Sequence, residues 1–393
     1  MLNKLIILLT VIYQGLWKWN KELSLLKKEF LEYHQYLEVG QYELVFTSAS
    51  LVVLKHSRIK FLPESLQTTI SEFWESPNKK LDVASKLQKK LFLIRNSSSR
   101  KHSNLVVYDC SSNSIKKAKA QIALLRSSGK IVLFDLEKNL VYTKYALNRV
   151  KHTRCFIQSS QMWGYSMMKN EIDNYFSLPD DRGIVGLFYC QELVEGKSFS
   201  SLTIAERLNI VREICFSAKN ASKNGKLKST VNGLDIIQEG FALALLNVKR
   251  PDMLQYIKSR QKILLEHSKS WRIVPSHCDL TAHNITILNE HPILLDLAPH
   301  KVGFVPSFFI PLCLIHSEVK EYGRLDLLTA FLKGELDDEF SSIIGKNFNP
   351  KNQHSHTDLL LAETIILAAI DSKITPQNIE YWFDPIFEII NTK

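Results

Sequence analysis

Short apolar runs dominate the middle of the chain, and apolar residues at helical spacing dominate its second half. A short apolar run bounded by turn residues predicts a strand, whereas apolar residues three and four apart predict an amphipathic helix. On this basis we predict strands over residues 51–54, 122–125, 131–134, 140–146, 183–190 and 192–194. We predict helices over residues 21–38, 66–74, 79–93 and 160–176, and a mostly helical chain after residue 200, except around 273–297.

The order of these elements divides the chain into parts. Residues 96–103 are polar and carry no apolar pattern, so we expect a loop or part of a linker there. Strands precede helices in the segment that follows, which is typical of an α+β unit with two lobes. We therefore expect an N-terminal extension of unknown role over residues 1–110, with mixed helices and short strands. A first lobe would cover residues 115–195, and a mostly helical second lobe residues 197–393.

The composition fits a folded protein of more than one domain. Of the 393 residues, 45% are hydrophobic and 23% are charged, which excludes a disordered chain, a collagen-like chain and a coiled coil. The net charge of +10 favours anionic partners, such as nucleotide phosphates, acidic glycans, nucleic acid or a membrane face. The sequence has no basic stripe with interleaved aromatic residues, so we expect no specific nucleic-acid partner.

The cysteines and the first residues bear on location. The six cysteines are scattered without a C-x-x-C pair, which is typical of reduced, mostly buried thiols in a cytosolic protein. The apolar run over residues 5–17 is shorter than the about 20 residues of a membrane-spanning helix, and no small-residue cleavage site follows it. A buried element, an interfacial membrane anchor and a signal peptide stay open for this run. We expect a cytoplasmic protein whose N-terminus allows peripheral membrane contact.

The most informative stretch covers residues 274–299, VPSHCDLTAHNITILNEHPILLDLAP. It contains a His-x-Asp, then an Asn after four further residues, and finally an Asp within the apolar run ILLDLA. These residues are His277, Asp279, Asn284 and Asp296. Phosphoryl transfer from ATP needs a carboxylate that orients or deprotonates the attacking hydroxyl, and oxygen ligands that hold Mg²⁺ against the phosphates. The spacing predicts a loop between short strands and then a hairpin that ends in an acid.

The segment HCDLTAHN, from His277 to Asn284, resembles the H-G-D-L-H-x-x-N loop of the aminoglycoside phosphotransferase and choline kinase branch of the protein-kinase-like fold. The resemblance covers roughly residues 115–345, with Cys278 in place of a common Gly. It implies a two-lobed protein-kinase-like fold and an ATP-dependent phosphotransferase that acts on an alcohol group. It further implies that Asp279 is the catalytic residue and that Asn284 and Asp296 hold Mg²⁺. By the same resemblance, His277 packs beneath the loop and orients it.

The resemblance also assigns phosphate contacts upstream. Lys144 lies in the third strand-like run, where a kinase-like first lobe keeps the Lys that contacts the α- and β-phosphates. Lys130 and Lys151 are also near, and Lys130 is the alternative candidate. The helix that follows offers Glu171 as the partner of Lys144. The turn between the first two strands contains Gly129, and its backbone N–H groups would contact phosphate.

Adenine recognition is assigned to the end of the first lobe. Residues 191–196, QELVEG, resemble the hinge that receives adenine through backbone groups. Glu192 and Val194 are therefore the expected adenine contacts, although a plain strand-to-helix turn has the same pattern.

The acceptor hydroxyl is less clear from the sequence. A sugar hydroxyl of a glycan ranks first, because the segment after Asp296 resembles that of kinases that phosphorylate sugars of bacterial surface glycans. An aminoglycoside or a choline-like amino alcohol ranks second. Acidic and aromatic residues that could meet a cation are Glu318, Glu321, Asp326, Glu335, Asp337, Asp338, Glu339, Phe304, Phe308, Phe309 and Tyr322. A catalytically weak, kinase-like binding module is the alternative class, because the phosphate-covering turn has only one Gly.

Overall fold

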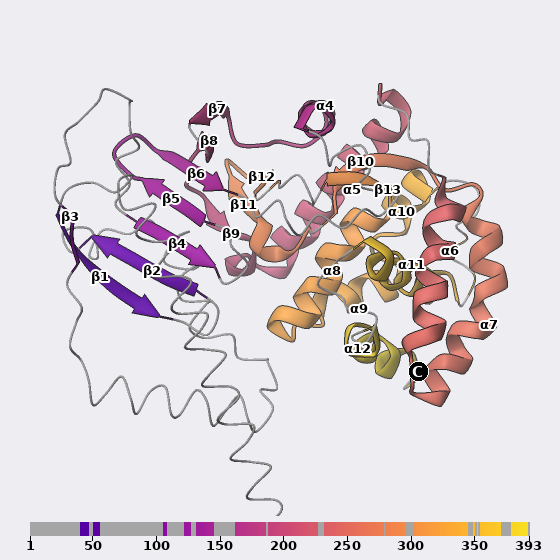
Figure 1. The fold of residues 1–393 in the computed structure, drawn as a ribbon. Coiled ribbons are helices and arrows are strands. Elements are labelled where there is room, and N and C mark those ends of the chain that lie inside the picture. Colours follow the sequence, from indigo (N-terminus) through magenta and orange to yellow (C-terminus); the bar gives the residue numbers. More distant parts are fainter. Residues whose placement is uncertain are drawn as a thin grey trace, which may run out of the picture. The chain divides into compact units, whose positions relative to one another are not determined.

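The computed structural model describes residues 40–46, 50–55, 105–107, 122–126, 131–144, 162–185, 188–226, 232–278, 280–295, 297, 302–344, 349, 352, 354–370 and 379–391. The chain forms two compact units (Figure 1). The first unit comprises Met1–Ala146 and Pro179–Val194, and the second comprises Leu147–Leu178 and Glu195–Lys393. The helices expected over residues 21–38, 66–74 and 79–93 lie outside the described residues, as does the apolar run at 5–17.

The first unit is built on an eight-stranded sheet in which every neighbouring pair is antiparallel. The strand order is β3-β1-β2-β4-β5-β6-β8-β7. The bounds are β1 Gly40–Phe46, β2 Ser50–Lys55, β3 Leu105–Val107, β4 Ile122–Arg126, β5 Ile131–Asp135, β6 Leu140–Lys144, β7 Asp181–Val185 and β8 Phe188–Glu192.

Most of these strands agree with the sequence pattern, and two differences stand out. The last strand of the sheet in sequence covers 188–192, whereas the pattern placed it at 192–194. The sheet also continues into the first 110 residues, because β2 pairs with β4 in the register Leu51↔Leu125 and Val53↔Ala123. Pairing with β2 satisfies the hydrogen-bonding groups along the outer edge of β4, which would otherwise be exposed. No break in the sheet therefore separates residues 1–110 from the segment that follows.

The second unit is mostly helical. Its helices are α4 Met162–Asp173, α5 Ile204–Asn224, α6 Gly233–Asn247, α7 Pro251–Ser268, α8 Phe309–Tyr322, α9 Asp326–Leu332, α10 Asp337–Ile344, α11 Ser355–Ile370 and α12 Ile379–Asn391. Two short 3₁₀ turns, η5 Phe199–Ser201 and η6 Ala282–Asn284, accompany them. One small sheet joins β10 Ile273–His277 to β13 Val302–Pro306, and another has the order β12-β11-β9. The strands of this second sheet are β9 Lys197–Ser198, β11 Ile285–Leu288 and β12 His291–Leu294.

The strands within 273–297 agree with the sequence pattern, whereas β13 was not expected. Helix α4 agrees with the helix expected over 160–176, but it packs against β10 and β13 of the second unit. Its Ile172, together with Phe176 just beyond its end, belongs to the core of that unit. The segment 115–195 expected as one lobe is therefore divided between the two units.

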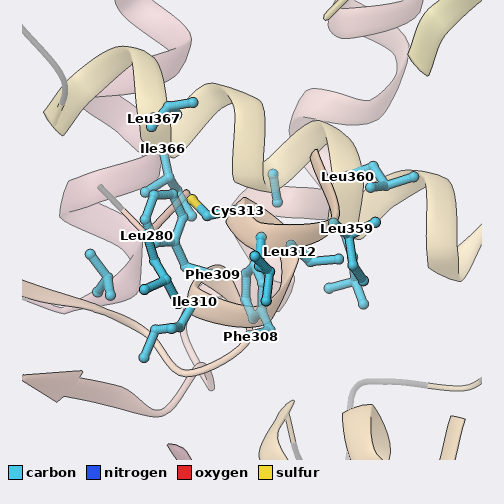
Figure 2. Close-up of a cluster of buried hydrophobic side chains, with 14 of the residues drawn as sticks. Leu280, Phe308, Phe309, Ile310, Leu312, Cys313, Leu359, Leu360, Ile366 and Leu367 are labelled. Atoms are coloured by element: carbon cyan, nitrogen blue, oxygen red, sulfur yellow. The ribbon is translucent and has the colours of Figure 1, made fainter. Parts of the chain in front are cut away.

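The core of the second unit centres on α8 and α11. Every described residue of α11 from His356 to Ile370 is buried except Thr357, so this helix is enclosed on nearly all sides. Figure 2 shows side chains from α8, such as Phe309 and Cys313, among those of α11, such as Ile366, with Leu280 beside them. Cys190, Cys215, Cys278 and Cys313 are free and buried, as expected for reduced thiols. Among the described helices, none is both long and apolar enough to cross a membrane.

A close approach of backbones joins α6 to α11. A Cβ placed on Gly240 would meet the carbonyl oxygen of Ile365 and lie 2.7 Å from its Cγ2 atom. The absence of a side chain at Gly240 therefore lets the two helices pack at this distance.

We predict that Gly240→Ala lowers the free energy of unfolding by about 1–3 kcal/mol, because a backbone carbonyl cannot move aside as a side chain can. This loss outweighs the about 1 kcal/mol by which Ala normally favours a helix over Gly. The matched control is Leu246→Ala, since Leu246 lies on the same helix and is 82% exposed. Urea unfolding of both variants checks this, and a Gly240→Ala protein as stable as the wild type contradicts it.

Candidate functional site

The loop between β10 and β11 is fixed by a hydrogen bond at its first end. His277, the last residue of β10, is fully buried, and its Nε2 atom lies 3.1 Å from the carbonyl oxygen of Leu295. A carbonyl oxygen only accepts hydrogen bonds, so Nε2 carries the hydrogen and donates it. The imidazole of His277 is committed to this contact, which agrees with the orienting role expected from the sequence.

Asn284 closes the loop at its other end through its backbone. The N–H of Asn284 donates to the carbonyl of Thr281 at 2.9 Å, and the carbonyl of Asn284 accepts from the N–H of Leu295 at 2.7 Å. The β11–β12 register continues this contact, because Ile285 lies opposite Leu294. Leu295 therefore receives His277 at its carbonyl and donates to Asn284 from its N–H. It joins both ends of the loop immediately before Asp296 in the sequence.

Several predicted site residues have no described position. Asp279, Asp296 and Gly129 lie outside the described residues, and so does the alternative Lys130. Asn284 is described and half-buried. Within the described ranges, no group of three His, Cys, Asp or Glu side chains is arranged to hold a metal ion. The expected metal pair consists of Asn284 and Asp296, so this search does not cover it.

In the first unit, Lys144 lies at the end of the sheet where β4 and β5 are connected. It is the last residue of β6 and lies opposite Ile131, the first residue of β5. Lys144 is half-buried, and it shares a face of the sheet with Tyr142, since residues two apart in a strand point the same way. Burial, with smaller contributions from Cys190 and Asp135, raises the pKa of Tyr142 to about 12. The surroundings of the strand next to Lys144 are therefore poorly solvated.

The adenine candidates lie at the end of β8. Glu192 is the last residue of β8, and its N–H donates to the carbonyl of Asp180 at 2.9 Å. The N–H of Leu193 donates to Asn139 at 2.7 Å. Val194 follows directly and is half-buried. The N–H of Glu192 is therefore engaged within the sheet, and Val194 is the better candidate for a backbone contact with a base.

Glu171 has a defined partner within the second unit. Its side chain is buried on α4, and its Oε1 atom accepts a hydrogen bond of 2.5 Å from the N–H of Lys226, just beyond α5. Glu171 thereby fixes the end of α5 to α4. Its expected pairing with Lys144 stays a prediction.

The residues considered for a cationic acceptor are largely committed elsewhere. Phe304, Phe308 and Phe309 are buried in the core of the second unit, so they form no open aromatic cage. The ring of Tyr322 is covered by the guanidinium of Arg324, 5.1 Å from its centre.

The acidic candidates are also engaged in part. Glu318 pairs with Arg207, Asp337 hydrogen-bonds His356, and Glu339 pairs with Arg212. The acidic bias of this segment thus serves the packing of the helices.

Sequence reasoning missed the contacts that α8 makes with the loop. The hydroxyl of Ser317 lies 3.0 Å from the N–H of Ala282, and the phenol of Tyr322 lies 2.9 Å from Nδ1 of His283. Ser317 stands 35 residues from its partner in the sequence, and no motif marks it.

No protein-family model and no curated protein matches the chain. Among solved structures, a choline kinase from Streptococcus pneumoniae is similar with a TM-score of 0.43 and 10% identity, over 78% of this chain and 100% of that chain. A choline/ethanolamine kinase family protein from Mesorhizobium loti has a TM-score of 0.43 and 12% identity, over 67% and 84%. An aminoglycoside phosphotransferase from Streptomyces rimosus has a TM-score of 0.36 and 12% identity, over 60% and 90%. These are the kinds of kinase that the loop sequence resembles, and at scores below 0.5 the likeness is one of general outline.

We predict that His277→Leu lowers the free energy of unfolding by about 1–3 kcal/mol, because the carbonyl of Leu295 loses its buried donor. The matched control is His291→Leu, since His291 is exposed and pairs with Glu213 at the surface. Such a surface pair contributes at most about 1 kcal/mol. Thermal unfolding of the two variants measures the difference, and equal losses would refute the anchoring role of His277.

Proposed function

We propose that the chain is an ATP-dependent phosphotransferase that moves the γ-phosphate to a hydroxyl group. The observation that carries the proposal is the double use of Leu295, which joins His277 to Asn284 through its two backbone groups. Consecutive Cα atoms are 3.8 Å apart, so Asp296 follows this junction by one residue and Asp279 follows His277 by two. The chain connectivity thus supports a cluster of Asp279, Asn284 and Asp296.

These three residues carry the chemistry that phosphoryl transfer needs. Asp279 would orient the acceptor hydroxyl and accept its proton late in the reaction. Asn284 and Asp296 would hold Mg²⁺, and their hard oxygen atoms suit that ion. The backbone of Asn284 is fixed on both sides, which favours a defined position for its side chain. Bound Mg²⁺ would neutralise the charge of the phosphates.

The first unit would supply the nucleotide contacts. Lys144 would contact the α- and β-phosphates, with Glu171 as its partner, and backbone groups of the turn at Gly129 would cover the phosphates. Lys144 is half-buried at the end of the sheet that carries this turn, which supports the assignment. Val194, with Glu192 beside it, would receive the adenine.

The acceptor that fits best is a neutral or anionic hydroxyl compound, with a glycan sugar first. Two observations disfavour a quaternary ammonium compound at the residues named for it. The three Phe side chains are buried, and Arg324 lies over the ring of Tyr322. An amino alcohol or aminoglycoside is the second candidate, and a catalytically weak binding module is the alternative class. We place the protein in the cytoplasm, with peripheral membrane contact through its N-terminus.

We predict that Asp279→Asn slows phosphate transfer by about 10²- to 10⁴-fold, because the positioned base is lost while the shape is kept. Nucleotide binding in the presence of Mg²⁺ should change little, since Asn284 and Asp296 are intact. Asp296→Asn should weaken Mg²⁺-dependent nucleotide binding as well as turnover. Calorimetric titration with ATP and a turnover assay over sugars, glycans and amino alcohols measure both properties. Near-normal turnover by Asp279→Asn would favour the binding-module alternative.

A further prediction concerns the phosphate-binding lysine. Lys144→Ala should weaken ATP binding and leave the melting temperature nearly unchanged, because a half-buried residue at a strand end contributes little to the core. Lys138→Ala is the matched control, since Lys138 is exposed and lies at the opposite end of the β5–β6 hairpin. Calorimetric titration with ATP checks both variants. Unchanged affinity in Lys144→Ala would shift the assignment to Lys130.

A further inference from the structure

Helix α8 carries three consecutive buried polar residues, His316, Ser317 and Glu318, which we name the α8 triplet. Their exposed fractions are 1%, 3% and 0%. Successive residues of a helix point about 100° apart, so each of the three faces a different neighbour. His316 contacts Glu363 of α11 at 2.8 Å through Nδ1, and Glu318 pairs with Arg207 of α5.

The third member, Ser317, faces the loop. Its hydroxyl lies 2.9 Å from the carbonyl of Leu314 in its own helix, so the hydroxyl hydrogen is donated there. The oxygen is then free to accept from the N–H of Ala282 at 3.0 Å. Both partners are buried, so no water can replace this acceptor without opening the site. Loss of the hydroxyl would leave the N–H of Ala282 unsatisfied, which is costly.

Two further contacts bind the same loop to the same helix. The phenol of Tyr322, at the C-terminal end of α8, contacts His283, the residue after Ala282. Leu280 is fully buried and lies among the side chains of α8 and α11 (Figure 2). The loop is therefore attached to α8 by an apolar side chain, a backbone N–H and a surface side chain in succession.

We infer that Ser317 is a positioning residue that sets the place of Asn284, and through it the affinity of the site for Mg²⁺. Ala282 and Asn284 share the single turn η6, so a shift of the N–H of Ala282 moves Asn284 with it. The α8 triplet makes this support rigid, because its other two members tie α8 to α11 and α5. The inference rests on the proposed function, in which Asn284 holds the metal.

The test compares three variants with the wild type. Ser317→Ala removes the acceptor, and Ser317→Thr keeps it. Ser268→Ala is the matched control, because Ser268 is fully buried and donates to Leu265 in the same way, at the end of α7. Hydrogen exchange of peptides covering residues 280–284, followed by mass spectrometry, should be about 5- to 150-fold faster in Ser317→Ala, as expected for a lost buried hydrogen bond. Ser317→Thr and Ser268→Ala should exchange at this loop like the wild type.

The second readout is the Mg²⁺ concentration that half-saturates nucleotide binding. It should rise by about 10- to 100-fold in Ser317→Ala, which is the usual effect of removing a residue that supports a metal ligand. If Ser317→Ala fails to fold, Tyr322→Phe removes the neighbouring contact from a half-exposed position. It should change both readouts in the same direction and by less.

The outcomes separate this inference from the proposed function. A wild type that binds Mg²⁺ and ATP, with both readouts unchanged in Ser317→Ala, would overturn the inference alone. A wild type without Mg²⁺-dependent nucleotide binding would overturn the proposed function, and the metal role of Ser317 with it. Equal changes in Ser268→Ala would show a general loss of stability and would also overturn the inference.

Discussion

The second unit depends on one constraint: polar backbone groups of an irregular loop must be satisfied inside an apolar core. Leu280 and Ala282 are buried, so the loop between β10 and β11 runs through the interior. A buried N–H or carbonyl without a partner costs free energy comparable to a lost hydrogen bond. Leu295 and Ser317 supply partners for this loop, and the positions of its side chains follow from theirs.

The helices around the loop are held by buried charges as well as by apolar contact. Glu363 lies fully buried on α11 and receives His316, Cys313 and Thr364. Burying a carboxylate is costly unless it is well hydrogen-bonded, so these contacts offset the cost of its desolvation. Burial, opposed in part by Asp384 and Glu363, lowers the pKa of Lys320 on α8 to about 8. Such groups favour a single arrangement of α8 against α11, which a purely apolar interface would define less strictly.

The sequence predicted the strands and the loop motif where the signal is local. The apolar runs at β4, β5 and β6 are bounded by turn residues, and the spacing from His277 to Asn284 is contained in one short segment. Strand β13 was missed because its sequence, VGFVP, contains Gly and Pro, which weaken a strand pattern. Ser317 was missed because its partner is set by the packing of α8. That packing depends on contacts spread over the whole core.

The same reasoning explains why the two units differ in how well they were predicted. The pattern found β4 to β6 one by one, but it gave no sign that β2 pairs with β4 and carries the sheet into the first 110 residues. Pairing between distant strands depends on register and on which edges stay open, and neither is written in one local segment. The role of Glu171 was likewise unclear from the sequence, because its partner Lys226 lies 55 residues away.

The most direct test of the account is a crystal structure with Mg²⁺ and a non-hydrolysable ATP analogue. The account predicts a metal ion about 2.0–2.1 Å from the side-chain oxygen of Asn284 and from a carboxylate oxygen of Asp296. The carboxylate of Asp279 should face the terminal phosphate without touching the metal. A nucleotide bound elsewhere, or a metal ion held without Asn284 and Asp296, would contradict the central claim.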